Sequence, residues 1–214
     1  MSTIQAVIFD MDGLLIDSEP LWQEAGSETL STFGINLTDE QYHSSTGLRT
    51  PEWIDHWFGY FGIDKAHAPE AIKTIEATAI AKIKARGEAL PGVEYIMNYF
   101  HNRNIPIAIA SSSPMKLIDE VVEKLSIGQF LQVKTSAEKL AYGKPHPEVF
   151  INCAKELDMR PQHCLVFEDS FNGMIAAKAA KMKCAVVPAP SVQQELRWKA
   201  ADLVLSSLNE FKGF

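Results

Sequence analysis

Short apolar runs rich in β-branched residues alternate with helical patterns along most of the 214-residue chain. Most of these runs are apolar at consecutive positions, as in strands that are covered on both faces of a parallel sheet. The pattern predicts strands at 4–9, 105–110, 130–134, 164–167, 184–187 and 203–205, and helices near 93–103, 114–125, 147–157 and 172–182. Such alternation is typical of an α/β fold with a doubly wound parallel sheet.

Residues 18–88 interrupt this alternation. They contain no convincing strand, but apolar residues recur at the spacing of helices that pack on other helices. The two clearest stripes are Trp53, Ile54, Trp57, Phe58 and Phe61, and Ile72, Ile75, Ala79 and Ile83. We therefore expect an α/β core formed by residues 1–17 and 89–214. Residues 18–88 are expected to form an inserted helical cap at the carboxyl edge of its sheet.

Charge and composition exclude several classes of partner. Twenty Lys and Arg against 27 Asp and Glu give a net charge of −7, whereas proteins that bind the nucleic-acid backbone are usually basic. No apolar run approaches the roughly 18 residues that a membrane helix needs. Residues 1–9 lack the features of a secretion signal. Three scattered cysteines are interpreted as core residues. We expect a cytoplasmic protein with no nucleic-acid or membrane partner.

The first predicted strand ends in Asp10-Met11-Asp12-Gly13. Residues just beyond the carboxyl ends of parallel strands face the ligand crevice of an open sheet. If the chain stays extended, both aspartates can address one side of that crevice. One carboxylate can act as a nucleophile that forms an acyl phosphate, and a second can protonate the leaving alkoxide and later activate water. Taken alone, the motif could equally be a solvated acidic turn.

Hydroxyl and ammonium donors follow later strands. The serines at 111–113 and then Pro114 come directly after the second strand, and such a helix start can bind an anion through hydroxyl and N–H donors. Lys144 lies between a glycine and two prolines, in a rigid loop suited to a point-charge contact with phosphate. Separately, the serines could be a helix cap and the lysine an ordinary exposed side chain.

Two further acids, Glu168 and Asp169, follow another buried strand. Together with Asp10 and the main chain at Asp12, they form an oxygen-rich set suited to Mg²⁺. Each of the four motifs is weak by itself. They occur in order at the carboxyl ends of predicted strands, and that conjunction is specific for phosphoryl chemistry at a metal.

The four motifs resemble those of the haloacid dehalogenase superfamily, whose members are mostly phosphatases. The resemblance spans essentially the whole chain and includes a helical cap after the first motif, as in the β-phosphoglucomutase-like subgroup. More narrowly, residues 9–22, 46–49, 136–140 and 187–190 resemble the bacterial 2-deoxyglucose-6-phosphate (hexitol phosphate) phosphatases. This resemblance implies a Rossmann-like catalytic core and a cytoplasmic enzyme of carbohydrate metabolism.

The resemblance also implies a role for each matching residue. Asp10 is implied as the nucleophile that becomes phosphorylated, and Asp12 as the general acid and base. The implied phosphoryl ligands are Ser111, the backbone of Ser112 and Lys144. The implied Mg²⁺ ligands are Asp10, the Asp12 carbonyl and Asp169, with Glu168 binding the ion directly or supporting its ligands; Mn²⁺ or Co²⁺ can substitute. In the cap, Trp22 and Arg49 are implied to face the sugar.

These expectations combine into a monomeric, Mg²⁺-dependent phosphatase of small sugar phosphates. The substrates implied are 2-deoxyglucose-6-phosphate and hexose or hexitol phosphates. A sugar phosphomutase is the main alternative, disfavoured because the mutases have a histidine at the position of Trp22. Dehalogenases lack the second aspartate, present here as Asp12. A response-regulator receiver has neither this aspartate nor an inserted cap. A non-catalytic sugar-phosphate sensor is disfavoured because every motif residue is present.

Overall fold

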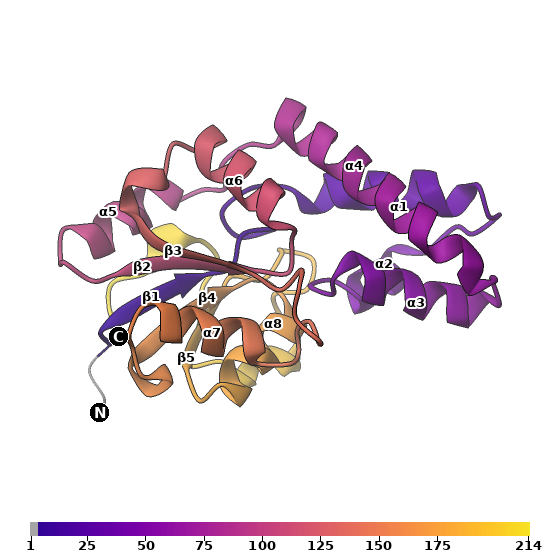
Figure 1. Ribbon diagram of the computed structural model, residues 1–214. Helices are drawn as coiled ribbons and strands as arrows, with labels where there is room; N and C mark the ends of the chain where they lie inside the picture. The colour runs from indigo at the N-terminus through magenta and orange to yellow at the C-terminus, as the bar shows by residue number, and fades with distance from the viewer. Residues whose placement is uncertain (1–3) are drawn as a thin grey trace.

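The computed structural model describes residues 4–214 and contains one six-stranded parallel sheet (Figure 1). Its strands are β1 (Ala6–Phe9), β2 (Ile107–Ser111), β3 (Leu131–Ser136), β4 (Cys164–Glu168), β5 (Lys183–Val186) and β6 (Leu203–Val204). The strand order is β3-β2-β1-β4-β5-β6, so the direction of winding reverses at β1. In open sheets of this kind, ligands bind outside the carboxyl ends of the strands at the point of reversal.

Helices cover both faces of the sheet (Figure 1). They are α5 (Val93–His101), α6 (Met115–Lys124), α7 (Glu148–Glu156) and α8 (Phe171–Ala179). Alternate residues of β1 face opposite layers, because successive side chains of a strand point to opposite sides. Val7 and Phe9 pack in the layer of α5 and α6, and Ala6 and Ile8 pack in the layer of α7 and α8.

All six predicted strands and all four core helices are confirmed, with ends that shift by at most three residues. Strand β1 is completely buried, which explains its unbroken apolar sequence. Cys153, Cys164 and Cys184 are free thiols in the core, as interpreted from the sequence. Residues 1–3, which we assigned to the core, lie outside the described residues.

Four helices lie between β1 and α5 and contribute no strand to the sheet. They are α1 (Glu19–Ser31), α2 (Asp39–Ser44), α3 (Thr50–Phe61) and α4 (Ala68–Arg86). Ile54, Trp57 and Phe58 of α3 are buried, whereas Phe61 is partly exposed, so the predicted stripe is confirmed except at its end. Figure 1 shows these helices beside the carboxyl ends of the strands. They are called the cap below.

The chain enters and leaves the cap through two adjacent segments. The backbone N–H of Asp17 donates to the carbonyl of Glu88 at 2.8 Å, and Ile16 forms an isolated antiparallel β-bridge with Ala89. The cap boundaries at 17/18 and 88/89 stay a prediction.

The remaining elements are 3-10 turns at Lys65–His67, Gly128–Phe130, Pro161–His163, Leu196–Ala200 and Leu208–Glu210. Across residues 4–214, none of the helices has the length and apolar character required to cross a bilayer.

Candidate active site

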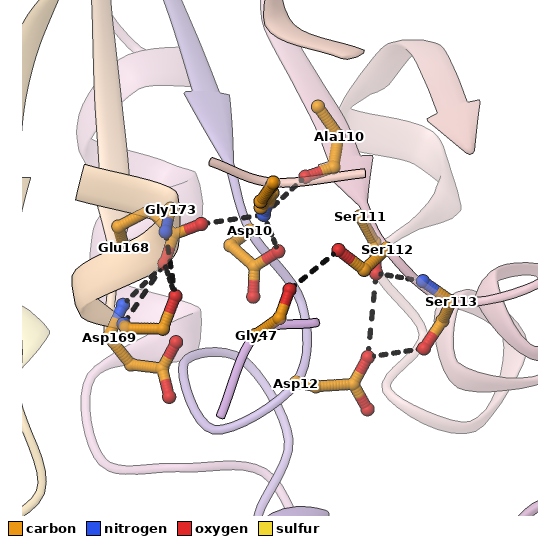
Figure 2. Close-up of polar contacts among 12 residues, drawn as sticks. Asp10, Asp12, Gly47, Ala110, Ser111, Ser112, Ser113, Glu168, Asp169 and Gly173 are labelled. Atoms are coloured by element: carbon orange, nitrogen blue, oxygen red, sulfur yellow. Dashed lines mark hydrogen bonds and ion pairs between the residues drawn. The ribbon is translucent and has the colours of Figure 1, made fainter. Parts of the chain in front are cut away.

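The carboxyl ends of β1, β2 and β4 bring the motif residues together (Figure 2). Asp10 follows β1, Ser111 ends β2 and Glu168 ends β4. Asp10 is fixed there because its backbone N–H continues the sheet ladder to the carbonyl of Phe167, at 2.9 Å. The parallel register therefore sets one side chain from each strand around a common centre.

Lys144 lies in the loop between β3 and α7, and its side chain is only 2% exposed. Its ammonium donates to Asp10 Oδ1, and to Glu168 Oε1 at 2.6 Å. Burial alone would lower the pKa of Lys144, but the attraction of Asp10 and Glu168 raises it above its ordinary value. The reading as an exposed surface lysine is therefore wrong. Lys144 is a fixed positive charge at the base of the site.

Glu168 is completely buried and its carboxylate is held from two sides. While Oε1 accepts from Lys144, Oε2 accepts from the backbone N–H of Asp169 at 3.1 Å. The backbone N–H and the hydroxyl of Ser170 both donate to Oε2 at 3.0 Å. Helix α8 can approach this closely because residue 173 is glycine: a Cβ there would lie 1.8 Å from Oε1.

Carboxylate oxygens of Asp10, Glu168 and Asp169 lie within 4.8 Å of one another. Burial raises the pKa of Asp10 to about 8, partly offset by Lys144, and burial together with Glu168 raises the pKa of Asp169. Two of these acids, Asp10 and Glu168, are buried and Asp169 is partly buried. When ionised, the three carboxylates have only the Lys144 ammonium beside them and are short of positive charge. A hard divalent cation with oxygen ligands fits this set, and Mg²⁺ is the natural choice.

The Asp12 carboxylate is not part of this metal-ligand set and accepts hydrogen bonds from four donors. Figure 2 shows two of them, the hydroxyls of Ser111 and Ser113. Oδ1 accepts from the Ser18 hydroxyl at 2.7 Å and from the Trp22 indole N–H at 2.9 Å. Oδ2 accepts from the hydroxyls of Ser113 at 2.7 Å and Ser111 at 3.4 Å. The two predicted substrate contacts Trp22 and Ser111 thus both bind Asp12 in this structure.

Two of these donors, Ser18 and Ser113, were missing from our predicted site. Both lie next to predicted residues, in the segment after Asp12 and in the serine run. The sequence shows that both residues carry a hydroxyl, but it does not show that these hydroxyls point toward Asp12. The Ser112 hydroxyl donates to the carbonyl of Gly47 at 3.0 Å, which links the serine loop to the cap.

Arg49 precedes α3 and lines the same cavity, but its guanidinium binds protein. Nη1 donates to the carbonyls of Ala137 and Leu140 at 3.0 and 2.7 Å. Nη2 pairs with Glu52 at 2.7 Å, and Glu52 in turn accepts from the N–H of Gly143 at 2.8 Å. The cap is thereby tied to the loop that carries Lys144.

The cavity between cap and core has a volume of about 720 Å³, its mouth included. Asp10, Asp12, Lys144 and Asp169 lie along its core side, and Trp22, Tyr42, Leu48, Trp53 and Ile75 form an apolar wall on the cap side. A further acid, Glu19, also lines it and was not predicted. Burial, followed by the nearby Asp12, raises the pKa of Glu19 to about 8. A deep cavity with a few converging polar groups is typical of a small-molecule site.

We compared the chain with a protein-family model and with known proteins. Residues 7–187 match the model of the haloacid dehalogenase-like hydrolases. The chain is 38% identical to hexitol phosphatase B of Escherichia coli (strain K12) over 97% of its length and 94% of that protein. It is 27% identical to a phosphorylated carbohydrates phosphatase of Thermotoga maritima, over 83% and 82% of the two chains.

The fold is shared with solved structures. A β-phosphoglucomutase from Clostridium difficile superposes with a TM-score of 0.87 at 26% identity, over 98% of this chain and 94% of that one. The likeness covers the sheet as well as the cap, since almost the whole of both chains is included. It confirms the predicted Rossmann-like core.

Proposed function

The chain belongs to the haloacid dehalogenase-like hydrolases, and we propose that within this family it is a Mg²⁺-dependent phosphatase of small sugar phosphates. The observation that carries the proposal is the pairing of Asp10 with buried Lys144 beside Glu168 and Asp169, at the base of the cavity. The second aspartate, Asp12, lies on the same cavity wall. The proposed nucleophile Asp10, the Lys144 ammonium and the proposed proton carrier Asp12 therefore all line one cavity.

In the first half-reaction, an Asp10 oxygen attacks phosphorus and the bond from phosphorus to the sugar oxygen breaks. Asp12 supplies the proton that this oxygen needs to leave as an alcohol. In the second half-reaction, water attacks the aspartyl phosphate while Asp12 takes one of its protons. The bond from phosphorus to Asp10 breaks, the carboxylate is regenerated and inorganic phosphate is released.

The other residues hold the reacting group. Lys144 compensates phosphoryl charge through its buried ammonium, and the serine loop at 111–112 offers hydroxyl and backbone donors. Asp10, Asp169 and the Asp12 carbonyl would hold Mg²⁺, with Glu168 beside them. When bound, the ion would offset the repulsion between Asp10 and the phosphate dianion. Mn²⁺ or Co²⁺ offers the same charge to these oxygens.

The proposed substrates are 2-deoxyglucose-6-phosphate and hexose or hexitol phosphates. The names of the hexitol and carbohydrate phosphatases support this class. The structural likeness to a β-phosphoglucomutase favours a mutase as the second candidate. The two reactions differ in product: a phosphatase releases inorganic phosphate, and a mutase returns an isomerised sugar phosphate. A sensor would release neither from a broad panel of phosphate esters.

The nucleophile is tested by Asp10→Asn, which removes the attacking charge and changes the shape of the side chain little. We expect loss of turnover for every phosphomonoester, with the fold kept as judged by circular dichroism. The matched control is Asp17→Asn, the same change at an exposed carboxylate of the same segment, which should keep activity. Retained phosphate release by Asp10→Asn would disprove the assignment.

A further inference from the structure

The three serines at the end of β2, residues 111–113, point their hydroxyls at different partners (Figure 2). The Ser112 hydroxyl donates to the carbonyl of Gly47 in the cap at 3.0 Å. The Ser113 hydroxyl donates to Asp12 Oδ2 at 2.7 Å, and the Ser111 hydroxyl lies 3.4 Å from the same oxygen. Because a hydroxyl has a single proton, each serine can donate to only one acceptor at a time. Ser111 and Ser113 therefore differ in what they can do for Asp12.

Ser111 is the weaker of these two donors. Its distance of 3.4 Å exceeds the range of about 2.5–3.0 Å that is usual for a hydrogen bond between a hydroxyl and an oxygen. The Ser111 oxygen is fixed, since it accepts the backbone N–H of Ser113 at 3.0 Å. The Ser111 proton can therefore turn to a bound phosphoryl oxygen, and Asp12 then loses only a long contact. Among residues 4–214, Ser113 is the one donor that remains on Oδ2.

Ser113 is rigidly placed for this task. The residue is only 6% exposed. Its carbonyl accepts from the hydroxyl of Ser136, the last residue of β3, at 2.6 Å, and its N–H binds Ser111 at the end of β2. Pro114 follows it and restricts the backbone before α6. A donor that is already fixed loses little conformational entropy when it binds, so its direction toward Asp12 is well defined.

The two oxygens of Asp12 are held by different parts of the chain. Oδ1 accepts from Ser18 and Trp22, where the chain enters the cap, and Oδ2 accepts from Ser113 of the core. In the proposed reaction, the sugar alcohol leaves the cavity before water attacks the aspartyl phosphate. Any opening of the cap that releases the alcohol moves Trp22, which is part of α1, whereas Ser113 stays with the sheet. Ser113 thus holds Asp12 at the stage when water has to be activated.

We propose that Ser113 is the residue that positions Asp12 as the base for hydrolysis of the aspartyl phosphate. This inference rests on the proposed phosphatase function. In this step a water oxygen bonds to phosphorus, one water proton passes to Asp12, and the bond from phosphorus to Asp10 breaks, its electron pair returning to the carboxylate. Asp12 is a carboxylate at this stage, because it gave its proton to the alcohol. When Ser111 turns to the phosphoryl group, the lone pair that it leaves on Oδ2 is open to the water.

The test separates the two half-reactions with p-nitrophenyl phosphate, whose phenolate leaves without a proton. Ser113→Ala removes the hydroxyl and keeps the backbone contacts of the residue. With the full chain and Mg²⁺, stopped-flow absorbance follows nitrophenolate, and intact-protein mass spectrometry of quenched samples follows the phosphorylated chain. We expect the aspartyl phosphate to form within about threefold of the parent rate but to be hydrolysed at least about tenfold more slowly, so that it accumulates.

Three further variants complete the test. Ser113→Thr returns a hydroxyl to the same position and should bring hydrolysis back to within about threefold of the parent rate. Ser136→Ala removes the donor to the Ser113 carbonyl and should slow hydrolysis in the same way but by less, which tests the contact even if Ser113→Ala does not fold. The matched control is Ser206→Ala, which removes a hydroxyl that donates to the Glu210 carboxylate at 2.8 Å near the end of the chain. It should leave both rates unchanged.

The outcomes separate this inference from the proposed function. Hydrolysis at the parent rate in Ser113→Ala would overturn the role of Ser113 and keep the phosphatase. Equal slowing of formation and hydrolysis would also overturn it, because it would indicate a general disturbance of the site. A loss in Ser113→Thr as large as that in Ser113→Ala would count against the hydroxyl in the same way. Absence of phosphate release by the parent protein, from p-nitrophenyl phosphate and from glucitol 6-phosphate, would instead contradict the phosphatase function itself.

Discussion

Asp12 is one of the residues that join cap and core. Two of its donors, Ser18 and Trp22, lie at the start of the cap, and two, Ser111 and Ser113, lie after β2 of the core. A carboxylate with four donors is held as an acceptor in a defined orientation. For proton transfer its geometry matters as much as its presence, because a proton carrier must be within hydrogen-bond reach of the leaving oxygen.

The indole N–H of Trp22 is predicted to position Asp12 for catalysis. Trp22→Phe keeps an aromatic ring but removes the donor to Oδ1. Because a hydrogen bond to a charged group contributes about 1.5–3 kcal/mol, kcat for glucitol 6-phosphate should fall by at least about tenfold, with KM nearly unchanged. For p-nitrophenyl phosphate the fall should be much smaller, since a phenolate leaves without a proton.

The control for this change is Trp57→Phe, which removes another indole donor from the cap, the one to the Ser45 hydroxyl at 3.3 Å. Steady-state kinetics with both leaving groups provides the readout. An equal fall for both substrates in Trp22→Phe would indicate a structural role of the ring and contradict positioning of the acid.

At the scale of elements, the start of α3 and the loop at 137–143 act as one unit. Arg49 spans the carbonyls of Ala137 and Leu140, while Glu52 binds Gly143, the residue before Lys144. Arg49→Lys keeps the charge but cannot supply the planar fork that reaches several acceptors. We expect faster amide hydrogen exchange across residues 137–143 and a kcat lowered several-fold, because Lys144 is less firmly placed.

The matched control is Arg103→Lys, at an exposed arginine that donates to the carbonyl of Tyr99 within its own helical region. Hydrogen-exchange mass spectrometry of parent and variants gives the protection of each peptide. Unchanged protection of residues 137–143 in Arg49→Lys would contradict the proposed coupling between cap and loop.

Elements were easier to predict from the sequence than contacts within the site. Buried parallel strands such as β1 and β4 have unbroken apolar sequences, and the polar residue after each one marks the crevice. The direction in which a side chain of the site points depends on the conformation of loops, and the periodicity of apolar residues does not predict loop conformation. Arg49 is an example. The carbonyls that it binds lie about 90 residues further along the chain, and no sequence pattern near position 49 predicts these contacts. Glu19 was overlooked because a helix start commonly carries an acid.

For the whole molecule, the buried acids make stability depend on pH when no metal is bound. The pKa of Asp10 and that of Glu19 are raised to about 8 in the folded protein, chiefly by burial, and the pKa of Asp169 is raised as well. Between pH 4 and pH 8 the folded state therefore binds more protons than the unfolded state. Stability of the metal-free protein must fall as the pH rises through this range.

Mg²⁺ should reverse this trend, since the proposed site would hold it through ionised carboxylates that come together only in the folded state. At about 100 times its dissociation constant, it should add about 2.7 kcal/mol, which corresponds to a rise in Tm of about 5–11 °C for a chain of this size. The rise should be larger at pH 8 than at pH 6. Calorimetry with EDTA or MgCl₂ at equal ionic strength measures it, with Asp169→Asn as the variant that loses most of the shift. An equal shift in parent and variant would mean that Mg²⁺ binds elsewhere.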